Sequence, residues 1–438
     1  MKPLCVVSCP IDTFSGYGAR SRDFVKALIQ SKGEEWDIKI IPQRWGETPW
    51  NALSQDDPLR QRFIPGLDQN NQPDIWIQIT IPNEFQPAGK SFSMGVTAGI
   101  ECNILPGDMI EGINRMNLTL ISSEHSKNIA LATQFEKIDN KTDQSIGVTK
   151  CEKPVEVLFE GLDLTKYNKK PQNSGLLKDV YEDFCFLYTG HWLPGNFGED
   201  RKNTGLMIKT FLETFKGSSK KKPALILKTN MVDYSLLDRE SILKKIHKIR
   251  DKVSGNLPNI YLVHGEMTDD EMNQLNNDNK IKAFVSFTKG EGYGRPLAEA
   301  AITGKPVLAT NWSGHVDFLH PDYNILIGGE LKKVHKSAAN TWILKESEWF
   351  NINADIASRA MKDVFKHYKK YFEKSRKQTQ YLKDNWSFDK MVEKLNNLLP
   401  KIEPAPQNVP LNLPKLKKVG AKKEIPKLKL PKLKKLKI

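Results

Sequence analysis

Long hydrophobic runs are missing from this 438-residue chain, and cysteine is scarce. No apolar stretch approaches the ~20 residues that a membrane-spanning helix needs. The N-terminal stretch MKPLCVVSCP has too short an apolar core for a signal peptide and instead reads as a first strand. The cysteines lack the spacing of a metal site or a disulfide framework: Cys5, Cys9, Cys102, Cys151 and Cys185. We therefore expect a cytoplasmic protein whose thiols are reduced and mostly buried.

Negative charge is almost missing from one segment, the C-terminal tail. The whole chain carries a formal net charge of +14. Residues 414–438 contain eleven lysines and one glutamate, so they contribute +10 and leave only +4 for the rest. The motif PKLK occurs there three times, starting at Pro414, Pro426 and Pro431. Proline prevents a continuous helix and the charge opposes collapse, which predicts a disordered basic tail over residues 401–438.

The expected partner of this tail is a polyanion, either DNA or an anionic membrane surface. Lysine clusters are attracted to both. The tail has no aromatic residue, which excludes base stacking as its way of holding nucleic acid. A solubilising extension without a partner is the alternative. If the tail binds a polyanion, the cytoplasmic protein would take a peripheral position at a membrane or on DNA.

The most informative stretch of the chain lies between residues 281 and 314. It begins with a short apolar run, AFVSF, that is typical of a strand. Gly290, Gly292 and Gly294 then break the run, and Pro296 suits the first turn of a helix. Gly304 marks the end of that helix, and another strand follows over residues 306–310. The pattern predicts a strand, a glycine-rich loop, a helix and a strand.

Two carboxylates occur in this unit, Glu291 on the loop and Glu299 inside the helix. The free N–H groups of a helix N-terminus attract phosphate. The two carboxylates could therefore hold sugar hydroxyls on either side of a diphosphate. The alternative is a plain βαβ unit with two solvated glutamates.

The string EGYGRPLAEA resembles the E-x7-E signature of the retaining, GT-B-fold glycosyltransferases typified by family 4. This resemblance implies two Rossmann-like doubly wound α/β domains that face each other over a cleft. It also implies a nucleotide-sugar as the donor substrate and no cofactor. The Asp-x-Asp triad that carries the metal in the other main glycosyltransferase fold is missing from the chain. Its absence favours a metal-independent reaction, with no metal-binding residues.

The first half of the chain begins as a Rossmann-like domain begins. An apolar strand over residues 4–8 is followed by Gly16, Gly18 and a helical pattern. The glycine spacing is not the full dinucleotide fingerprint, so a nicotinamide or flavin site is poorly supported. In GT-B enzymes a glycine turn here lies over the donor phosphates, which makes Gly16 and Gly18 candidate donor-binding residues. A plain strand-to-helix turn is the alternative.

Glu101 is a second candidate in the first half. It follows a strand expected over residues 93–97, and ligands in doubly wound folds bind outside the carboxyl ends of strands. The resemblance implies a histidine or an acidic residue near this position that contacts the transferred sugar. We assign that catalytic role to Glu101, with a structural loop residue as the alternative.

The second half supplies the candidate cations. Many members of the family carry an arginine after the first glycine of this domain and a lysine in an RKN-like string. Lys202 matches the lysine, whereas His191 stands where the arginine is usual. Arg201 or Arg295 could supply the missing charge. A departing nucleoside diphosphate gains negative charge, and without a metal it needs such cations.

The resemblance also implies roles for the residues of the signature itself. Glu299 would bind the ribose hydroxyls of the nucleotide. Glu291, with the backbone N–H groups of Gly292, Tyr293 and Gly294, would hold the sugar hydroxyls and stabilise an oxocarbenium-like transition state.

The sequence thus predicts four segments and one leading function. Residues 1–170 form an acceptor-side domain, residues 171–385 a nucleotide-sugar-binding domain, residues 386–400 a helix that crosses back to the first domain, and residues 401–438 the basic tail. The leading function is a retaining hexosyl- or pentosyltransferase that moves a sugar from a UDP- or GDP-sugar to a hydroxyl on a glycan, lipid or protein. One alternative is glycosylation of hydroxymethylated bases in DNA. Another is a non-catalytic binder of nucleotide-sugars or polyanions.

Overall fold

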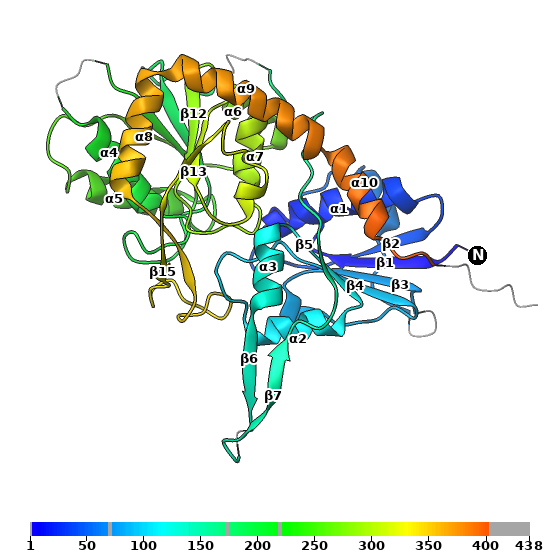
Figure 1. Cartoon of the computed structure of the whole chain (residues 1–438). Coiled ribbons are helices and arrows are strands. Elements are labelled where there is room, and N and C mark those ends of the chain that lie inside the picture. The colour runs from blue at the N-terminus through cyan, green and yellow to red at the C-terminus, as the bar shows by residue number, and fades with distance from the viewer. Residues whose placement is uncertain (1, 69–71, 140, 171–174, 218–220, 403–438) are drawn as a thin grey trace, which may run out of the picture. The chain divides into compact units, whose positions relative to one another are not determined.

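The computed structural model describes residues 2–68, 72–139, 141–170, 175–217 and 221–402. The predicted tail therefore lies outside the described residues from Glu403 onward. The described chain forms two parallel six-stranded sheets, each covered by helices (Figure 1). We call the parts built on these sheets the first lobe and the second lobe.

The sheet of the first lobe has the order β2-β1-β3-β4-β5-β8, and neighbouring strands run parallel. The order reverses direction between β1 and β3, so the loops after these two strands lie at a topological switch point. The strands are β1 (Leu4–Cys9), β2 (Asp37–Pro42), β3 (Ile75–Ile79), β4 (Phe92–Val96), β5 (Leu118–Ile121) and β8 (Val155–Val157).

The sheet of the second lobe has the order β11-β10-β9-β12-β13-β14 and is also parallel. Its switch point lies between β9 and β12, which brings the loop after β9 beside the loop after β12. The strands are β9 (Cys185–Thr189), β10 (Ala224–Lys228), β11 (Ile260–Val263), β12 (Ile281–Ser286), β13 (Val307–Thr310) and β14 (Ile325–Ile327).

The helices alternate with the strands, as parallel sheets require. The first lobe carries α1 (Gly16–Lys32), α2 (Gly107–Arg115) and α3 (Glu124–Ala132). The second lobe carries α4 (Thr204–Phe215), α5 (Leu236–Arg250), α6 (Asp269–Asn277), α7 (Arg295–Ile302) and α8 (Ala354–Lys366). The predicted strand, loop, helix and strand of the central stretch are confirmed as β12, α7 and β13. Thr268 and Glu271 form the capping box expected at the start of α6.

The chain returns from the second lobe to the first through α9 (Tyr368–Asn385) and α10 (Phe388–Leu398), and α10 packs on α1 (Figure 1). The backbone N–H of Leu162 donates to Trp386 O at 2.9 Å, and the N–H of Phe388 donates to Leu162 O at 2.8 Å. A Cβ on Gly161 would lie only 2.8 Å from Met391 Cβ. The glycine therefore permits the close approach of α10.

Two antiparallel hairpins were not predicted from the sequence. One is β6 (Gln134–Ile138) with β7 (Ser145–Lys150), which projects from the first lobe with mostly exposed side chains (Figure 1). The other is β15 (Gly329–Lys333) with β16 (Glu348–Ile352). β15 and β16 lack the alternation of apolar and polar residues that marks a strand with one buried face, whereas β7 alternates at Ile146 and Val148 but leaves both side chains exposed.

The cysteines are free thiols, and all except the half-buried Cys151 are buried. Burial raises the pKa of the Cys9 and Cys102 thiols to about 12, so these groups stay protonated at neutral pH. This confirms the prediction of mostly buried thiols. Among the described residues, no helix is both long and apolar enough to cross a membrane.

Candidate functional site

The glycine-rich loop between β12 and α7, residues 290–294, lies where the two lobes touch. A Cβ on Gly290 would lie 1.9 Å from Glu101 O, and one on Gly292 would lie 2.2 Å from Ala98 O. Ser122 Oγ, at the end of β5, donates to Gly292 O at 3.1 Å. The loop that follows β4 therefore packs directly on the signature loop. The carboxyl ends of strands from both sheets meet at this point.

Gly294 begins α7 in the left-handed conformation, with φ +99°. A residue with a Cβ adopts that conformation only at a cost, so glycine suits the sharp turn from loop to helix. Pro296 occupies the first turn of α7, where its missing N–H costs nothing. The turn presents the N-terminus of an eight-residue helix at the loop. Such a terminus favours negative charge.

Glu291 is buried and held by two cations from the loop after β9. Lys202 Nζ lies 2.5 Å from Glu291 Oε1, and Arg201 Nη1 lies 3.3 Å from Glu291 Oε2. Arg201 also donates to Gly290 O at 2.8 Å, and its Nη2 lies 3.4 Å from Glu101 Oε1. Arg201 therefore joins the predicted catalytic carboxylates Glu291 and Glu101 across the two lobes.

The charge state of Glu291 follows from these contacts. Burial acts to raise the pKa of the carboxyl, but Lys202 and Arg201 outweigh it and lower the pKa to about 2. Glu291 is therefore ionised throughout the neutral range.

Glu299 has a different environment one turn into α7. Arg295 Nε lies 2.9 Å from Glu299 Oε1, while Arg295 Nη1 lies 2.7 Å from Asp23 Oδ2 and 3.6 Å from Glu160 Oε2. One guanidinium is thus shared by three carboxylates, two of which belong to the first lobe. Burial raises the pKa of Glu299 to about 7 because Arg295 only partly offsets it.

His191 lies in the same loop region as the two cations. His191 as a whole residue is exposed to solvent. Partial removal of the ring from water and the positive charges of Lys202 and Arg201 lower the pKa of His191. At neutral pH it is a neutral imidazole, so it lacks the positive charge of the arginine that the resemblance led us to expect here.

Gly16 and Gly18 form the first turn of α1, which Ser15 caps by accepting from the N–H of Gly18 at 2.9 Å. A Cβ on Gly18 would lie 2.2 Å from Thr13 O, whereas Gly16 has open space around it. Tyr17, between them, reaches toward β4. Its hydroxyl lies 2.8 Å from Thr97 Oγ1 and accepts from the N–H of Ala98 at 3.2 Å.

Tyr293 points its side chain into the core. Only 3 % of the residue is exposed, and its ring lies 4.8 Å from that of Phe318. Within the described part of the chain its buried hydroxyl has no hydrogen-bond partner. Tyr293 can therefore serve the loop only through its backbone, which is the role that the resemblance implied.

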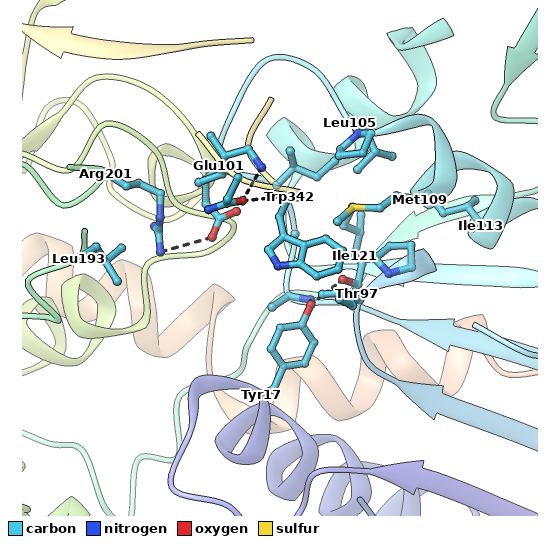
Figure 2. Close-up of a pocket in the computed structure, with 18 residues that line it drawn as sticks. Tyr17, Thr97, Glu101, Leu105, Met109, Ile113, Ile121, Leu193, Arg201 and Trp342 are labelled. Carbon is cyan, nitrogen blue, oxygen red and sulfur yellow. Dashed lines mark hydrogen bonds and ion pairs between the residues drawn. The ribbon is translucent and has the colours of Figure 1, made fainter. Parts of the chain in front are cut away.

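A cavity of about 250 Å³ adjoins this loop on the side of the first lobe. Figure 2 shows Glu101 and Arg201 at one end and Met109, Ile113 and Ile121 at the other, with the indole of Trp342 between them. Its lining comes from both lobes: Tyr17, Ile81, Pro82, Thr97, Ala98, Gly99, Ile100, Glu101, Leu105, Pro106, Met109, Ile113, Ile121, Leu193, Arg201, Asn340, Trp342 and Ile343.

Sequence reasoning missed Trp342 and the segment that carries it. The segment between β15 and β16 reaches the first lobe, where Asn103 Nδ2 donates to Glu348 Oε2 at 3.1 Å and the N–H of Glu348 donates to Asn103 Oδ1 at 2.6 Å. The partners are 245 residues apart in sequence, so no local pattern pointed to them. Tyr17 could have been found, because it lies between the two glycines already singled out.

Sequence reasoning also missed Lys289, which directly precedes the signature loop. Its side chain is fully buried, with Nζ 5.3 Å from the centre of the Trp349 ring and 3.6 Å from Glu199 Oε2. The N–H of Phe350 donates to Lys289 O at 2.9 Å. Lys289 therefore fixes β16 to the signature loop.

In the part of the chain that the structure describes, no group of three His, Cys, Asp or Glu side chains is placed to hold a metal ion.

Comparison with known proteins identifies the fold of this chain through solved structures. No sequence family and no curated protein matches the chain. Among solved structures, a complex of Anabaena HepE with UDP and glucose has 12% identity and a TM-score of 0.54, over 90% of this chain and 99% of that one. Sucrose-phosphate synthase from Thermosynechococcus elongatus has 9% identity and a TM-score of 0.57, over 91% and 98%. A glycosyltransferase from Rickettsia africae has 12% identity and a TM-score of 0.57, over 91% of this chain and 97% of that one.

These identities are low, so the likeness establishes the fold and no more. Together with the two parallel six-stranded sheets, it confirms the predicted GT-B architecture. One fold can carry several activities, and function must therefore be argued from the site.

Proposed function

We propose that this protein is a retaining glycosyltransferase that uses a nucleotide-sugar as its donor. The observation that carries the proposal is the pair of buried glutamates, Glu291 and Glu299, at the switch point of the second sheet, each bound to a cation. A carboxylate on the loop and another inside the helix flank the N-terminus of α7, which suits a diphosphate. The fold neighbours include a structure with bound UDP and glucose.

The donor would lie across the N-terminus of α7. Glu299 binds the ribose hydroxyls and Glu291 binds the hydroxyls of the sugar, with the backbone N–H groups of the signature loop beside it. Lys202 and Arg201 stabilise the negative charge that develops on the departing diphosphate. They supply this charge from the protein, so the proposed reaction needs no metal.

Glu291 forms ion pairs with both of these cations. A diphosphate at the loop must share them, which would draw Lys202 toward the leaving group and free Glu291 for the sugar. His191 lies beside the same cations and can donate one hydrogen bond to a phosphate oxygen. Glu101, tied to Arg201, would contact the transferred sugar from the first lobe.

The test is release of nucleoside diphosphate from a panel of UDP-, GDP- and ADP-sugars, with UDP-glucose first. Slow release from one donor is the expected result, because water replaces an absent acceptor. Glu291→Gln should abolish it, whereas the matched control Glu393→Gln, at an exposed side chain of α10, should not. No release from any donor and no binding of any of the three nucleotides would refute the proposal.

The two other hypotheses remain distinguishable in the same assay. Stimulation by duplex DNA that contains hydroxymethylcytosine, and not by unmodified DNA, would favour modification of a DNA base. Tight nucleotide binding without any release would favour a non-catalytic binder. If the lysine-rich tail contributes to DNA binding, the stimulation by DNA would fall steeply as the salt concentration rises.

A further inference from the structure

We propose that the acceptor hydroxyl is carried directly on an aromatic ring, or one carbon away from it, and that this ring binds in the cavity beside the signature loop. The inference rests on the proposed function, because it concerns the acceptor of the same reaction. It starts from the uneven distribution of polar and apolar groups in the cavity (Figure 2).

The inner wall of the cavity is part of a hydrophobic core. Leu105, Ile113 and Ile121 are buried, and they belong to the cluster that joins α2 and α3 to β5 and β8. These hydrocarbon side chains carry no hydrogen-bonding group, and because they are fixed in a packed core they do not move aside to uncover one. A sugar or polyol placed against this wall would lose water from its hydroxyls without replacement. The wall therefore selects an apolar group.

The polar groups lie at the opposite end of the cavity. Glu101 and Arg201 form an ion pair there, and Arg201 connects them to Glu291. Three other polar side chains line the cavity: the hydroxyls of Tyr17 and Thr97 bond to each other at 2.8 Å, and Asn340 Oδ1 accepts from the backbone of its own loop. A ligand that fits both ends has an apolar body with one hydroxyl directed toward Glu101. That end is also where the donor sugar would lie.

The cavity favours a flat ring over an aliphatic chain. Trp342 exposes 44% of its surface, yet its loop is ordered, with Asn340 Oδ1 accepting from the N–H groups of Trp342 and Ile343 at 2.8 and 2.9 Å. An indole face and a thioether, here that of Met109, both make favourable contacts with aromatic rings. A volume of about 250 Å³ exceeds the ~150 Å³ in which an engineered protein cavity binds benzene. One substituted ring fits.

The transfer step balances with the groups already named. The acceptor oxygen forms a bond to the anomeric carbon of the donor sugar. The bond from that carbon to the diphosphate oxygen breaks, and its electron pair leaves on the diphosphate. The proton of the acceptor hydroxyl passes to that departing oxygen.

The test compares acceptors that differ only in their apolar body. Transfer from the active donor is measured to 4-nitrobenzyl alcohol, cyclohexylmethanol, glycerol and methyl glucoside. The expected result is a kcat/KM for the benzyl alcohol well above the other three. Trp342→Ala should reduce its advantage over cyclohexylmethanol about tenfold, the size of one aromatic contact. Leu331→Ala is the matched control, because Leu331 lies exposed on β15, in the hairpin that also carries Trp342, and outside the cavity.

Equal use of all four acceptors, or preference for glycerol or methyl glucoside, would overturn the inference. So would an unchanged preference in Trp342→Ala. A separate measurement keeps this result apart from failure of the proposed function. Ligand-observed NMR should show 4-nitrobenzyl alcohol binding to wild-type protein and about tenfold more weakly to Trp342→Ala, even if no donor is cleaved.

Two sources offer this chemistry, a free aromatic alcohol and a hydroxymethylated base in DNA. The acceptor panel therefore includes hydroxymethylcytosine as the free nucleoside and within duplex DNA. A base within a duplex would have to leave the stack to reach the cavity. Preference for the free compounds identifies a small aromatic alcohol as the acceptor, and preference for the duplex identifies the base. Both outcomes support an aromatic acceptor.

Discussion

At the scale of single residues, two glutamates eight positions apart differ in charge because their cations differ in number. Glu291 has two cations, Lys202 and Arg201, and only Arg201 is shared with another carboxylate, Glu101, so the pKa of Glu291 falls to about 2. Glu299 shares Arg295 with Asp23 and Glu160, so burial prevails and its pKa rises to about 7. Residue type and spacing are visible in the sequence. The number of cations around each carboxylate is not, because those cations come from distant segments.

The first prediction concerns the ion pairs of Glu291. Glu291→Gln should lower the free energy of unfolding at neutral pH by about 3–5 kcal/mol, since it removes the carboxylate paired with the buried Lys202 and leaves Arg201 with Glu101 alone. Chemical denaturation of wild type and variant measures the difference. Glu393→Gln, an exposed change, should cost less than about 1 kcal/mol. A cost as small for Glu291→Gln would show that Lys202 and Arg201 are solvated.

The second prediction concerns the pH dependence due to Glu299. Its pKa is higher in the folded protein than the ordinary value of 4.5, so the folded state binds more protons over that interval. Its contribution to stability is therefore complete below pH 4.5 and is lost as the pH rises to about 7. The loss should amount to roughly 3–3.5 kcal/mol.

Glu299→Gln removes the titrating group and should remove that loss. Free energies of unfolding measured from pH 4.5 to 8 for both proteins provide the comparison. Parallel curves would contradict a raised pKa for Glu299. Glu291 acts in the opposite sense, because its lowered pKa makes its contribution present above pH 4.5 and lost as the pH falls toward about 2.

At the scale of elements, the signature unit was predictable from the sequence, and the β15–β16 hairpin that carries Trp342 was not. The β12 strand, the glycine turn and α7 follow one another in the chain, and local patterns predict such units well. The segment that carries Trp342 depends instead on contacts such as Asn103 with Glu348, 245 residues apart. The apolar cavity wall likewise joins α2 to β5, and α2 is a short helix without a capping side chain. The start of this helix therefore lacked the N-cap residue from which it could have been predicted.

The third prediction tests the contact between the signature loop and the loop after β4. Gly292→Ala should lower stability by about 1–3 kcal/mol and reduce turnover strongly, because its Cβ would meet Ala98 O at 2.2 Å. Gly66→Ala is the control, since nothing lies within 4 Å of its Cβ and its φ is not positive. Thermal unfolding and donor turnover measure the two effects. Wild-type behaviour of Gly292→Ala would mean that the two loops separate readily.

At the scale of the whole molecule, the site exists because two parallel sheets present the carboxyl ends of their strands to each other. Contacts between the lobes, such as Arg295 with Asp23 and Ser122 with Gly292, lie within the proposed donor site. The GT-B architecture was predicted from the signature string and is confirmed. The roles of the individual site residues are still predictions, as are the acceptor and the role of the tail. These properties depend on bound ligands.

The most direct test of the account separates nucleotide binding from turnover in two variants. With the donor found active, UDP-glucose first, kcat and the dissociation constant of the nucleoside diphosphate are measured for wild type, Glu299→Ala and Glu291→Ala. The account predicts that Glu299→Ala weakens nucleotide binding, while Glu291→Ala reduces kcat by about a hundredfold or more with a smaller effect on binding. Wild-type values in both variants would contradict the assignment of this site.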